Sequence, residues 1–357
     1  MSSDKIYYDA VISNLNNVTV QPPILYFNQT RSTPYVNNPS LYDLSIVRWT
    51  LDTQTLPIFR PTIKATTTDP NETIYSISLE YQGVIVEKFV IFEPQNETVP
   101  IPNAPLYRPN NLQDNGNGYY DIYTYSYWIY LINKAFSDAF DELSSPAENP
   151  IVMTIDNTNN ICLLNVPVTG YTGDDKVNIY FNTALGNLFS SFPFKIKSNQ
   201  IDGLNFQLQT DISGDANIVN FPTYNPDYEV VQIYQEYSTV QNWNPILSIC
   251  VLSSTLPVVQ NIEGAPALYL NGILLNGSGN NSNITNLITD FVADDYKPNI
   301  IYIPSAEYRR IELIGTQPLS NLDISIFWKD RFGNLNPFRL SSGGSATLKI
   351  MFEKKKV

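Results

Sequence analysis

The chain has 357 residues, of which 43% are apolar and 13% aromatic, so its composition supports a large buried core and excludes an intrinsically disordered protein. Its formal net charge of −13 makes the averaged surface field repel nucleic-acid backbones and anionic membranes. Histidine is absent, which removes the commonest general base and the commonest transition-metal ligand. Composition therefore disfavours general nucleic-acid binding and most enzyme chemistry.

The start of the chain is polar, and no apolar run is long enough to span a bilayer. We therefore expect neither a secretion signal nor a membrane span, and a protein made inside a cell. The two cysteines, Cys162 and Cys250, each lie in an apolar stretch and are expected to be small buried hydrophobes rather than a disulfide.

Residues 1–40 contain four scattered prolines and several asparagines without a sustained period, which predicts an extended N-terminal arm. The next stretch, 41–53, contains the run YDLSIVRWTL, which is apolar on both faces over several residues. This pattern is typical of a strand between two layers, so Trp49 and Leu51 are predicted to lie in the core.

Residues 73–93 carry the clearest local signal in the sequence. Apolar residues at 75, 77, 79 and 81 alternate with Ser76, Ser78 and Glu80, and a second apolar run follows Gln82-Gly83. Glycine supplies the positive φ that a tight turn commonly needs, so the segment predicts a β-hairpin.

Residues 122–143 switch to a helical period. Large apolar residues recur there at three- and four-residue spacing, namely Tyr125, Trp128, Ile129, Ile132, Phe136, Phe140 and Leu143. The stripe is predicted to be the core face of one long helix. Short strands separated by Asn, Gly and Asp follow it, so 96–226 is predicted to form a compact unit of one helix on a small sheet.

Six further strands are predicted, at 228–240, 246–258, 300–304, 308–315, 322–330 and 345–353. In the last two, alternate residues share an apolar face: Leu322, Ile324, Ile326 and Trp328, then Ala346, Leu348, Ile350 and Phe352. Residues 259–299 are predicted to be a long loop region.

The sequence has no GxxxxGK, GxGxxG or GxSxG motif and no CxxC pair. A site built from carboxylates alone stays open, either a glycosidase pair or a calcium site with oxygen ligands. The candidates are Asp174-Asp175 and Asp294-Asp295. Each pair lies in a turn, where acidic residues are common for structural reasons, so we interpret both as turn residues.

Two segments resemble a known family. They are QEYSTVQNWNPILSICVLSSTLPV at 235–258 and ISIFWKDRFGNLNPFRLSSGGSATLKIMF at 324–352. The second has an aromatic-ended strand, a DRFGN turn, a loop with Leu340, a Gly343-Gly344 break and a final amphipathic strand. Together with INKAFSDAFDEL and VNIYFNTALGNLFSSFPFKI, they cover about a third of the chain. These features are similar to the penton proteins of Sputnik-type virophages and Polinton-type elements, a lineage distantly similar to adenoviral pentons.

The resemblance implies an all-β fold, a single jelly-roll sandwich with an α+β insertion domain between strands D and E. Mapped onto this chain, residues 1–40 are the arm, 41–95 and 227–357 the jelly roll, and 96–226 an outward-facing insertion domain. Strands B to D then fall within 41–93, E and F at about 228–257, and G to I within 298–353.

The resemblance also implies a capsid protein without catalytic activity or cofactor, in the virion, made in the host cytoplasm or virus factory. Its copies would form homopentamers at the five-fold vertices and contact the major capsid protein and other minor capsid proteins. No Arg-Gly-Asp tripeptide occurs, so the integrin attachment of adenoviral pentons does not carry over. The alternative class is a β-sandwich attachment protein that binds carbohydrate or a host surface.

The one basic cluster is Lys354, Lys355 and Lys356 near the end of the chain. It is either a solubilising terminus or, if it faces the capsid interior, a contact to packaged nucleic acid that reads no sequence. We also expect residues 1–40 to become ordered only against neighbouring capsid proteins.

Overall fold

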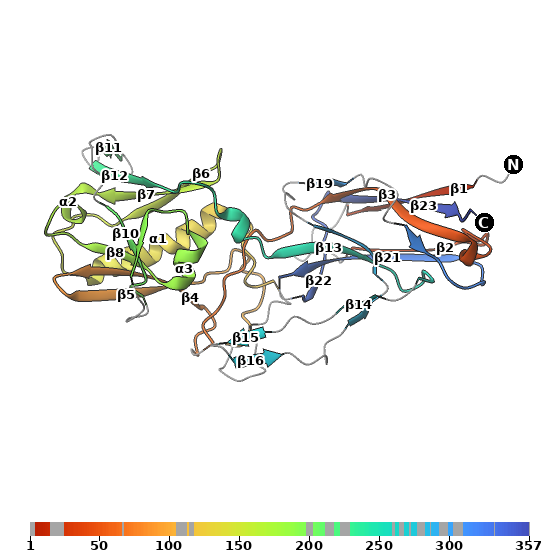
Figure 1. The fold of residues 1–357 in the computed structure, drawn as a ribbon, viewed down its shortest axis with the longest axis horizontal. Coiled ribbons are helices and arrows are strands. Elements are labelled where there is room, and N and C mark those ends of the chain that lie inside the picture. The colour runs from red at the N-terminus through yellow and green to blue at the C-terminus, as the bar shows by residue number, and fades with distance from the viewer. Residues whose placement is uncertain are drawn as a thin grey trace. The chain divides into compact units, whose positions relative to one another are not determined.

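The computed structural model describes residues 4–14, 25–65, 68–104, 113, 118–197, 203–210, 218–221, 229–258, 261–263, 268–270, 273–276, 283–285, 287–292, 299–302, 310–331 and 333–356. The chain divides into two units, each with its own hydrophobic core (Figure 1). Unit 1 comprises residues 1–56 and 245–357, and unit 2 comprises residues 57–244. Strands outnumber helices in the described residues, as the composition predicts.

Unit 1 consists of two antiparallel sheets (Figure 1). The first, called the β1 sheet, has the order β1 (Lys5–Ser13), β23 (Ser345–Lys354), β3 (Tyr42–Asp52) and β19 (Asn299–Tyr302), with β20 (Ile311–Glu312) also paired to β3. The second, the β2 sheet, has the order β2 (Tyr26–Thr30), β21 (Asn321–Asp330), β13 (Ile246–Leu252) and β18 (Leu287–Val292), with β22 (Leu335–Pro337) on β21.

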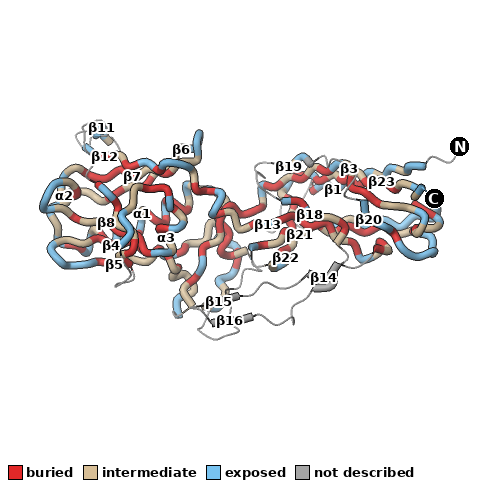
Figure 2. The backbone as a smooth tube through the Cα atoms, viewed as in Figure 1, coloured by how far each residue is buried: buried red, intermediate tan, exposed pale blue. Residues whose placement is uncertain are grey.

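The inner faces of these two sheets form the core of unit 1, and buried positions follow their strands in Figure 2. Trp49 and Leu51 on β3 are buried, as predicted, and the Trp49 ring lies 4.6 Å from that of Phe291 on β18, centroid to centroid. The predicted apolar faces of β21 and β23 are confirmed, because all eight of their residues are buried. Two-residue periodicity thus identified the inward faces of the final strands.

The prediction of an extended arm over residues 1–40 is wrong for the described part. Strand β1 pairs with β23 along its whole length, from Lys5 with Glu353 to Ser13 with Ser345. Its residues 6, 8, 10 and 12 point toward the core, and Leu25 further along is buried. The prolines that suggested an arm lie after β1, and residues 15–24 are outside the described residues.

Unit 2 has two antiparallel sheets with the main helix between them (Figure 1). One sheet has the order β5 (Val84–Ile91), β4 (Glu72–Tyr81), β8 (Asn178–Phe181), β10 (Phe206–Leu208) and β9 (Phe194–Ile196). The other has the order β11 (Ile218–Asn220), β12 (Glu229–Tyr234), β7 (Ile161–Pro167) and β6 (Val152–Asp156). Helix α1 (Tyr125–Glu142) packs on β4 and β5 of the first sheet and on β6 of the second.

The remaining elements are short. Helices α2 (Val168–Tyr171) and α3 (Thr183–Leu188) and the 3-10 turn η3 (Val240–Asn242) belong to unit 2, and η1 (Pro39–Leu41) precedes β3 in unit 1. Two small strand pairs lie between β13 and β18, where the sequence predicted a long loop: β14 (Asn261–Glu263) with β17 (Asn283–Thr285), and β15 (Leu268–Leu270) with β16 (Ile273–Asn276). Strand β18 itself also falls inside that predicted loop.

The two strongest local predictions are confirmed. Strands β4 and β5 form the hairpin, with positive φ at Gln82 (49°) and Gly83 (82°) in its turn. Helix α1 buries Trp128, Ile132 and Phe136 from the predicted stripe. Hairpins and helices depend on nearby residues, so sequence pattern alone locates them.

The expected domain boundaries at 95/96 and 226/227 differ from those of the structure, which lie at 56/57 and 244/245. The β4–β5 hairpin is not part of the sandwich of unit 1, because β4 pairs with β8, Ile77 opposite Phe181. Strand β12 likewise pairs with β7 inside unit 2. Strand period does not identify a strand's partner, so these two segments were assigned to the wrong unit.

Candidate assembly surfaces

The outer face of the β1 sheet, called the β1 face, carries an uncharged row that crosses four strands. The strand register places Val11 opposite Thr347, Thr347 opposite Thr50, and Thr50 opposite Ile301. The two threonine hydroxyls lie 2.6 Å apart. Val11 and Ile301 at the ends of the row are 59% and 72% exposed. Another chain could cover this row without desolvating a charged side chain of the row itself.

The next row of the β1 face is charged. Asp9 lies opposite Lys349, and Lys349 lies opposite Arg48. Both cations approach the Asp9 carboxylate at 3.7 Å, and the Lys349 ammonium lies 5.5 Å from the ring centre of Tyr7. Exposed ion pairs of this kind stabilise a fold little. They place two cations and one carboxylate beside the uncharged row.

The outer face of the β2 sheet, called the β2 face, is also apolar in places. Tyr26 lies opposite Ser325, Phe327 opposite Cys250, and Val292 opposite Ser248. Tyr26 and Val292 are 52% and 69% exposed. The solvent side of an antiparallel sandwich is normally polar, so the exposed aromatic and aliphatic side chains make these outer faces the candidate contact surfaces of unit 1. The β2 face is partly covered by the chain itself, because Ser248 and Cys250 on its central strand are buried.

Sequence reasoning missed these surfaces. On the β1 face, Tyr7 and Val11 fell in the segment read as an arm, although the alternation in KIYYDAVIS is the signal that identifies a strand. On the β2 face, Val292 fell in the predicted loop region. The strand register brings Val11, Thr50, Ile301 and Thr347 together. A pattern within one segment of the sequence cannot predict such a register, because the four residues lie on four different strands.

The C-terminal lysines lie close to the β1 sheet. The backbone N–H of Lys354, the last residue of β23, donates to the carbonyl of Asp4 at 2.8 Å. The Lys355 ammonium donates to Glu312 Oε1 at 2.6 Å and lowers the pKa of that carboxyl. Lys356 is exposed. The structure thus pairs the Lys355 side chain within the fold and holds Lys354 by its backbone, and contact of this cluster with nucleic acid stays a prediction.

The acidic pairs do not gather into a site. Asp174 and Asp175 are both exposed, and Asp175 accepts a hydrogen bond from the Tyr81 hydroxyl at 3.1 Å. Asp294 and Asp295 lie outside the described residues. Across the residues that the structure describes, no three Asp, Glu, Cys or His side chains lie close enough together to hold a metal ion.

The cysteine thiols are free and buried, one in each unit. Burial raises the pKa of Cys162 to about 12, so its thiol stays protonated at physiological pH and is a poor nucleophile. No helix within the described ranges is long and apolar enough to cross a membrane.

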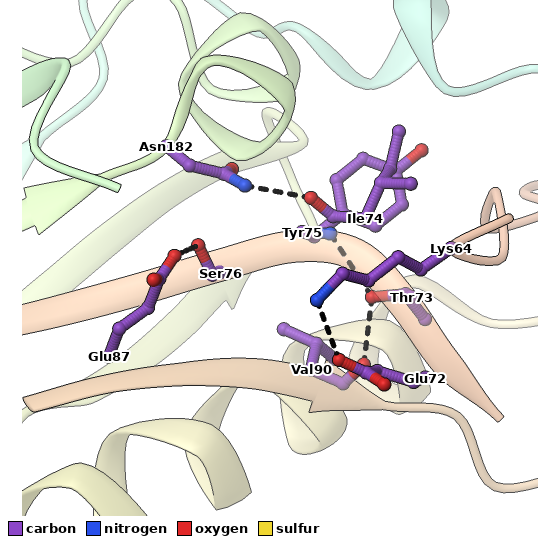
Figure 3. A network of polar contacts seen from close by, with 9 residues as sticks. All are labelled: Lys64, Glu72, Thr73, Ile74, Tyr75, Ser76, Glu87, Val90 and Asn182. Carbon is purple, nitrogen blue, oxygen red and sulfur yellow. Dashed lines mark hydrogen bonds and ion pairs between the residues drawn. The ribbon is translucent and has the colours of Figure 1, made fainter. Parts of the chain in front are cut away.

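Figure 3 shows a polar network on β4 that fixes its neighbours. The Thr73 hydroxyl donates to the carbonyl of Val90 on β5 at 2.8 Å. The Asn182 amide donates to the carbonyl of Ile74 at 2.7 Å, while its oxygen accepts from the Leu185 N–H at 2.9 Å and caps α3. These side chains satisfy backbone groups rather than point into a cavity, so the network holds β4, β5 and α3 together.

Two further contacts in Figure 3 involve carboxylates. The Ser76 hydroxyl donates to Glu87 across the hairpin at 2.5 Å, and Lys64 contacts Glu72 at 2.9 Å. Ser76 is fully buried, so the Glu87 carboxylate supplies the acceptor that its hydroxyl needs, and the Glu72 carboxylate pairs with Lys64. The network is therefore structural.

Asp323 on β21 is the best-satisfied buried charge of unit 1. Its carboxylate accepts hydrogen bonds from the hydroxyls of Ser253, Ser254 and Thr255 at 2.5 to 2.6 Å, and from the backbone N–H groups of Ser254 and Thr255. Burial would raise the pKa of this carboxyl, but the hydrogen bonds outweigh burial and lower it well below its ordinary value. Asp323 therefore anchors the turn after β13 as an anion.

Replacing Asp323 with asparagine is expected to lower the free energy of unfolding of unit 1 by about 1.5–3 kcal/mol at neutral pH, because an amide cannot accept all of these hydrogen bonds. The folded-state pKa is lowered, so the wild-type contribution is complete above the unfolded-state pKa of about 3.9 and is lost as the pH falls below it. Urea unfolding of both proteins over a pH series measures the difference. Equal stability at neutral pH would contradict the anchoring role.

A two-sheet sandwich whose polar networks serve structure is typical of a protein that works by assembly, and the family match settles the class. It is a structural capsid protein and not an enzyme. The chain belongs to the Sputnik minor capsid protein V18/19 family, whose model matches residues 6–354. The family expected from the sequence is thereby confirmed.

Two Sputnik virophage proteins are similar in sequence. An uncharacterised protein, V18, is 38% identical over 147 residues, which are 40% of this chain and 86% of V18. The structural protein V19 is 27% identical over 135 residues, 38% of this chain and 59% of V19. Each alignment covers less than half of this chain, whereas the family model covers nearly all of it.

Two solved structures match over nearly the full length. A chain of the Sputnik virophage cryo-EM structure has a TM-score of 0.85 with 28% identity, covering 99% of both chains. The crystal structure of the mavirus penton protein has a TM-score of 0.64 with 16% identity, covering 98% of this chain and 99% of that one. The second match shows a shared fold, so the chain has a penton-like fold. The family match and the match to the Sputnik virophage structure show that it is a component of the virion capsid.

Proposed function

We propose that this chain is the penton protein of a virophage capsid, five copies of which close around each five-fold vertex and contact the surrounding major capsid protein. The observation that carries the proposal is the strand order of unit 1. If β1, β2, β3, β13, β18, β19, β21 and β23 are named B to I in chain order, the two sheets have the orders B-I-D-G and C-H-E-F. This is the arrangement of a single jelly roll, a fold common in viral capsids.

The same naming places the whole of unit 2 between strands D and E. It also corrects the expected assignment of B to D within 41–93, since B and C are β1 and β2. We further propose that this unit is the outward-facing insertion domain of the vertex. The likeness to the mavirus penton protein over nearly the full chain supports the same role. We place synthesis in the host cytoplasm or virus factory.

Native mass spectrometry of the purified chain over a concentration series tests the proposal. We expect a closed species of five times the 40.4 kDa chain mass, without open intermediates at high concentration, because closed rings satisfy every contact. Negative-stain electron microscopy should show five-fold rings. Monomers alone at every concentration, or a different closed number, would contradict the penton assignment.

A further inference from the structure

We propose that the outer face of the sheet of β6, β7, β11 and β12 in unit 2 binds a neutral carbohydrate, with the ring of Tyr234 as the surface on which a sugar stacks. The inference goes beyond the proposed penton function and does not depend on it, because it concerns one unit of one chain. The surface, called the Tyr234 patch, consists of outward-facing residues on three neighbouring strands: Val152, Thr154, Leu163, Asn165, Gln232 and Tyr234.

The Tyr234 patch lies on the side of this sheet that faces away from the core of unit 2. Leu164 and Ile233 belong to that core, and helix α1 packs on β6. Successive side chains along a strand point to opposite faces, so the residues between the core positions face outward. The strand register places Thr154 opposite Leu163, and Leu163 opposite Tyr234. One row of the patch therefore crosses all three strands.

A chain of hydrogen bonds crosses the patch. The Tyr234 hydroxyl donates to Gln232 Oε1 at 2.7 Å, and Gln232 Nε2 donates to Asn165 Oδ1 at 2.9 Å. The Asn165 amide in turn donates to the Thr154 hydroxyl at 3.3 Å and to the carbonyl of Val152 at 3.2 Å. Asn165 is only 1% exposed, so the buried end of this chain anchors the exposed end.

The bond to Gln232 determines how the Tyr234 ring lies. Gln232 is two residues before Tyr234 on the same face of β12, about 6.8 Å away along the strand. A phenol whose hydroxyl reaches that neighbour lies along the strand and over the sheet. Tyr234 is still 50% exposed, so one side of the ring stays open to solvent. The ring is thus a flat apolar surface that is fixed before a ligand arrives.

The chemistry of the patch fits a sugar. A sugar ring has a face of C–H groups, which packs on an aromatic ring, and hydroxyls around its edge, which need hydrogen-bond partners. Half-buried Leu163 extends the apolar surface beside Tyr234. Gln232 uses one of its two amide hydrogens in the bond to Asn165, and the Tyr234 oxygen can also accept. Groups that are already held in place lose little conformational entropy on binding.

The charge pattern selects a neutral ligand. None of the six residues is charged, and the next outward position on β6 after Thr154 is Asp156. A nucleobase can also stack on tyrosine, but its phosphate would meet no cation in the patch and a chain with a net charge of −13. Sialylated and sulfated sugars meet the same repulsion. The patch therefore favours oligosaccharides without charge.

An array of immobilised oligosaccharides tests the inference. It carries neutral oligosaccharides of hexoses, N-acetylhexosamines and deoxyhexoses, with sialylated and sulfated ones for comparison. The probe is the fluorescently labelled full chain, as wild type and as Tyr234→Ala. The matched control is Tyr130→Ala, because Tyr130 is 48% exposed and lies on α1 of the same unit. Circular dichroism checks that each variant is folded.

Wild-type protein is expected to bind a subset of the neutral oligosaccharides. Tyr234→Ala should raise the protein concentration for half-saturation of those spots by about tenfold or more, since it removes the stacking surface. Tyr234→Phe retains the ring but loses the bond to Gln232, so the rise should be about threefold. Tyr130→Ala should bind as the wild type does.

Three results on the array would each overturn the inference: no binding to any neutral oligosaccharide, binding confined to the sialylated and sulfated ones, or equal binding by wild type and Tyr234→Ala. Native mass spectrometry of the same samples keeps this test apart from the penton assignment. If Tyr234→Ala alone loses the pentamer, the patch is a contact between copies and the carbohydrate site is wrong. A monomeric wild type that binds through Tyr234 would overturn the penton assignment and support the site.

Discussion

Replacing Trp49 with alanine is expected to lower the free energy of unfolding of unit 1 by about 3–5 kcal/mol. The indole is fully buried on β3 and packs against Phe291 of the opposite sheet, 4.6 Å away between ring centres. Its removal leaves a cavity in the side-chain core between the two sheets, into which the neighbouring side chains can relax only in part. Guanidinium unfolding followed by circular dichroism measures the loss.

Trp49→Phe is the matched control, since it retains an aromatic ring and most of the contact with Phe291. It is expected to cost less than half as much as the alanine variant. The transition of unit 2 should be unchanged by either substitution, because Trp49 belongs to the core of unit 1. A loss of less than about 1 kcal/mol for Trp49→Ala would contradict this expectation, because it would mean that neighbouring side chains fill the cavity.

Replacing Arg60 with methionine is expected to destabilise unit 2 by about 3–5 kcal/mol. Arg60 forms an ion pair with Asp121, and the two side chains are only 7% and 9% exposed. The pair lies beside the backbone bridge between Phe59 and Ile122, which joins the start of unit 2 to the segment that precedes α1. The substitution leaves the Asp121 carboxylate buried without its cation.

The pH dependence and a double variant distinguish this mechanism from lost packing. Burial raises the pKa of Asp121 and Arg60 opposes the rise, so removal of Arg60 raises the pKa further. An acid with a raised folded-state pKa destabilises the fold above that pKa, so the deficit of Arg60→Met should shrink as the pH falls through it. Adding Asp121→Leu should recover much of the loss at neutral pH. A deficit that does not change with pH would exclude the unpaired charge as its cause.

Local pattern was enough for those parts of the fold in which neighbouring residues decide the outcome. The stripe from Trp128 to Phe136 identified α1, and Gln82-Gly83 between two alternating runs identified the β4–β5 hairpin. The inner faces of β21 and β23 followed from a period of two. Each inference needed only the spacing of apolar residues within one element.

Those local patterns do not predict which strands pair with one another. The hairpin pairs with β8, about 100 residues further along, and β12 pairs with β7, so both belong to unit 2. Strand β1 was hidden by the prolines that follow it, and its partner is at the other end of the chain. The candidate surfaces depend on the same long-range register, which aligns Val11 with Thr347 and Thr50 with Ile301.

The pairing of β1 with β23 also determines when, during synthesis, unit 1 can complete its β1 sheet. Its contacts join residues about 330 to 350 positions apart, such as Lys5 and Glu353. All strand pairs of unit 2 lie within residues 57–244, so this unit can fold while the ribosome is still making the rest. Strands β1, β2 and β3 emerge earlier but must wait for partners that are translated after unit 2. A chain interrupted before β23 is translated has no complete β1 face, because β23 is the strand that joins β1 to β3.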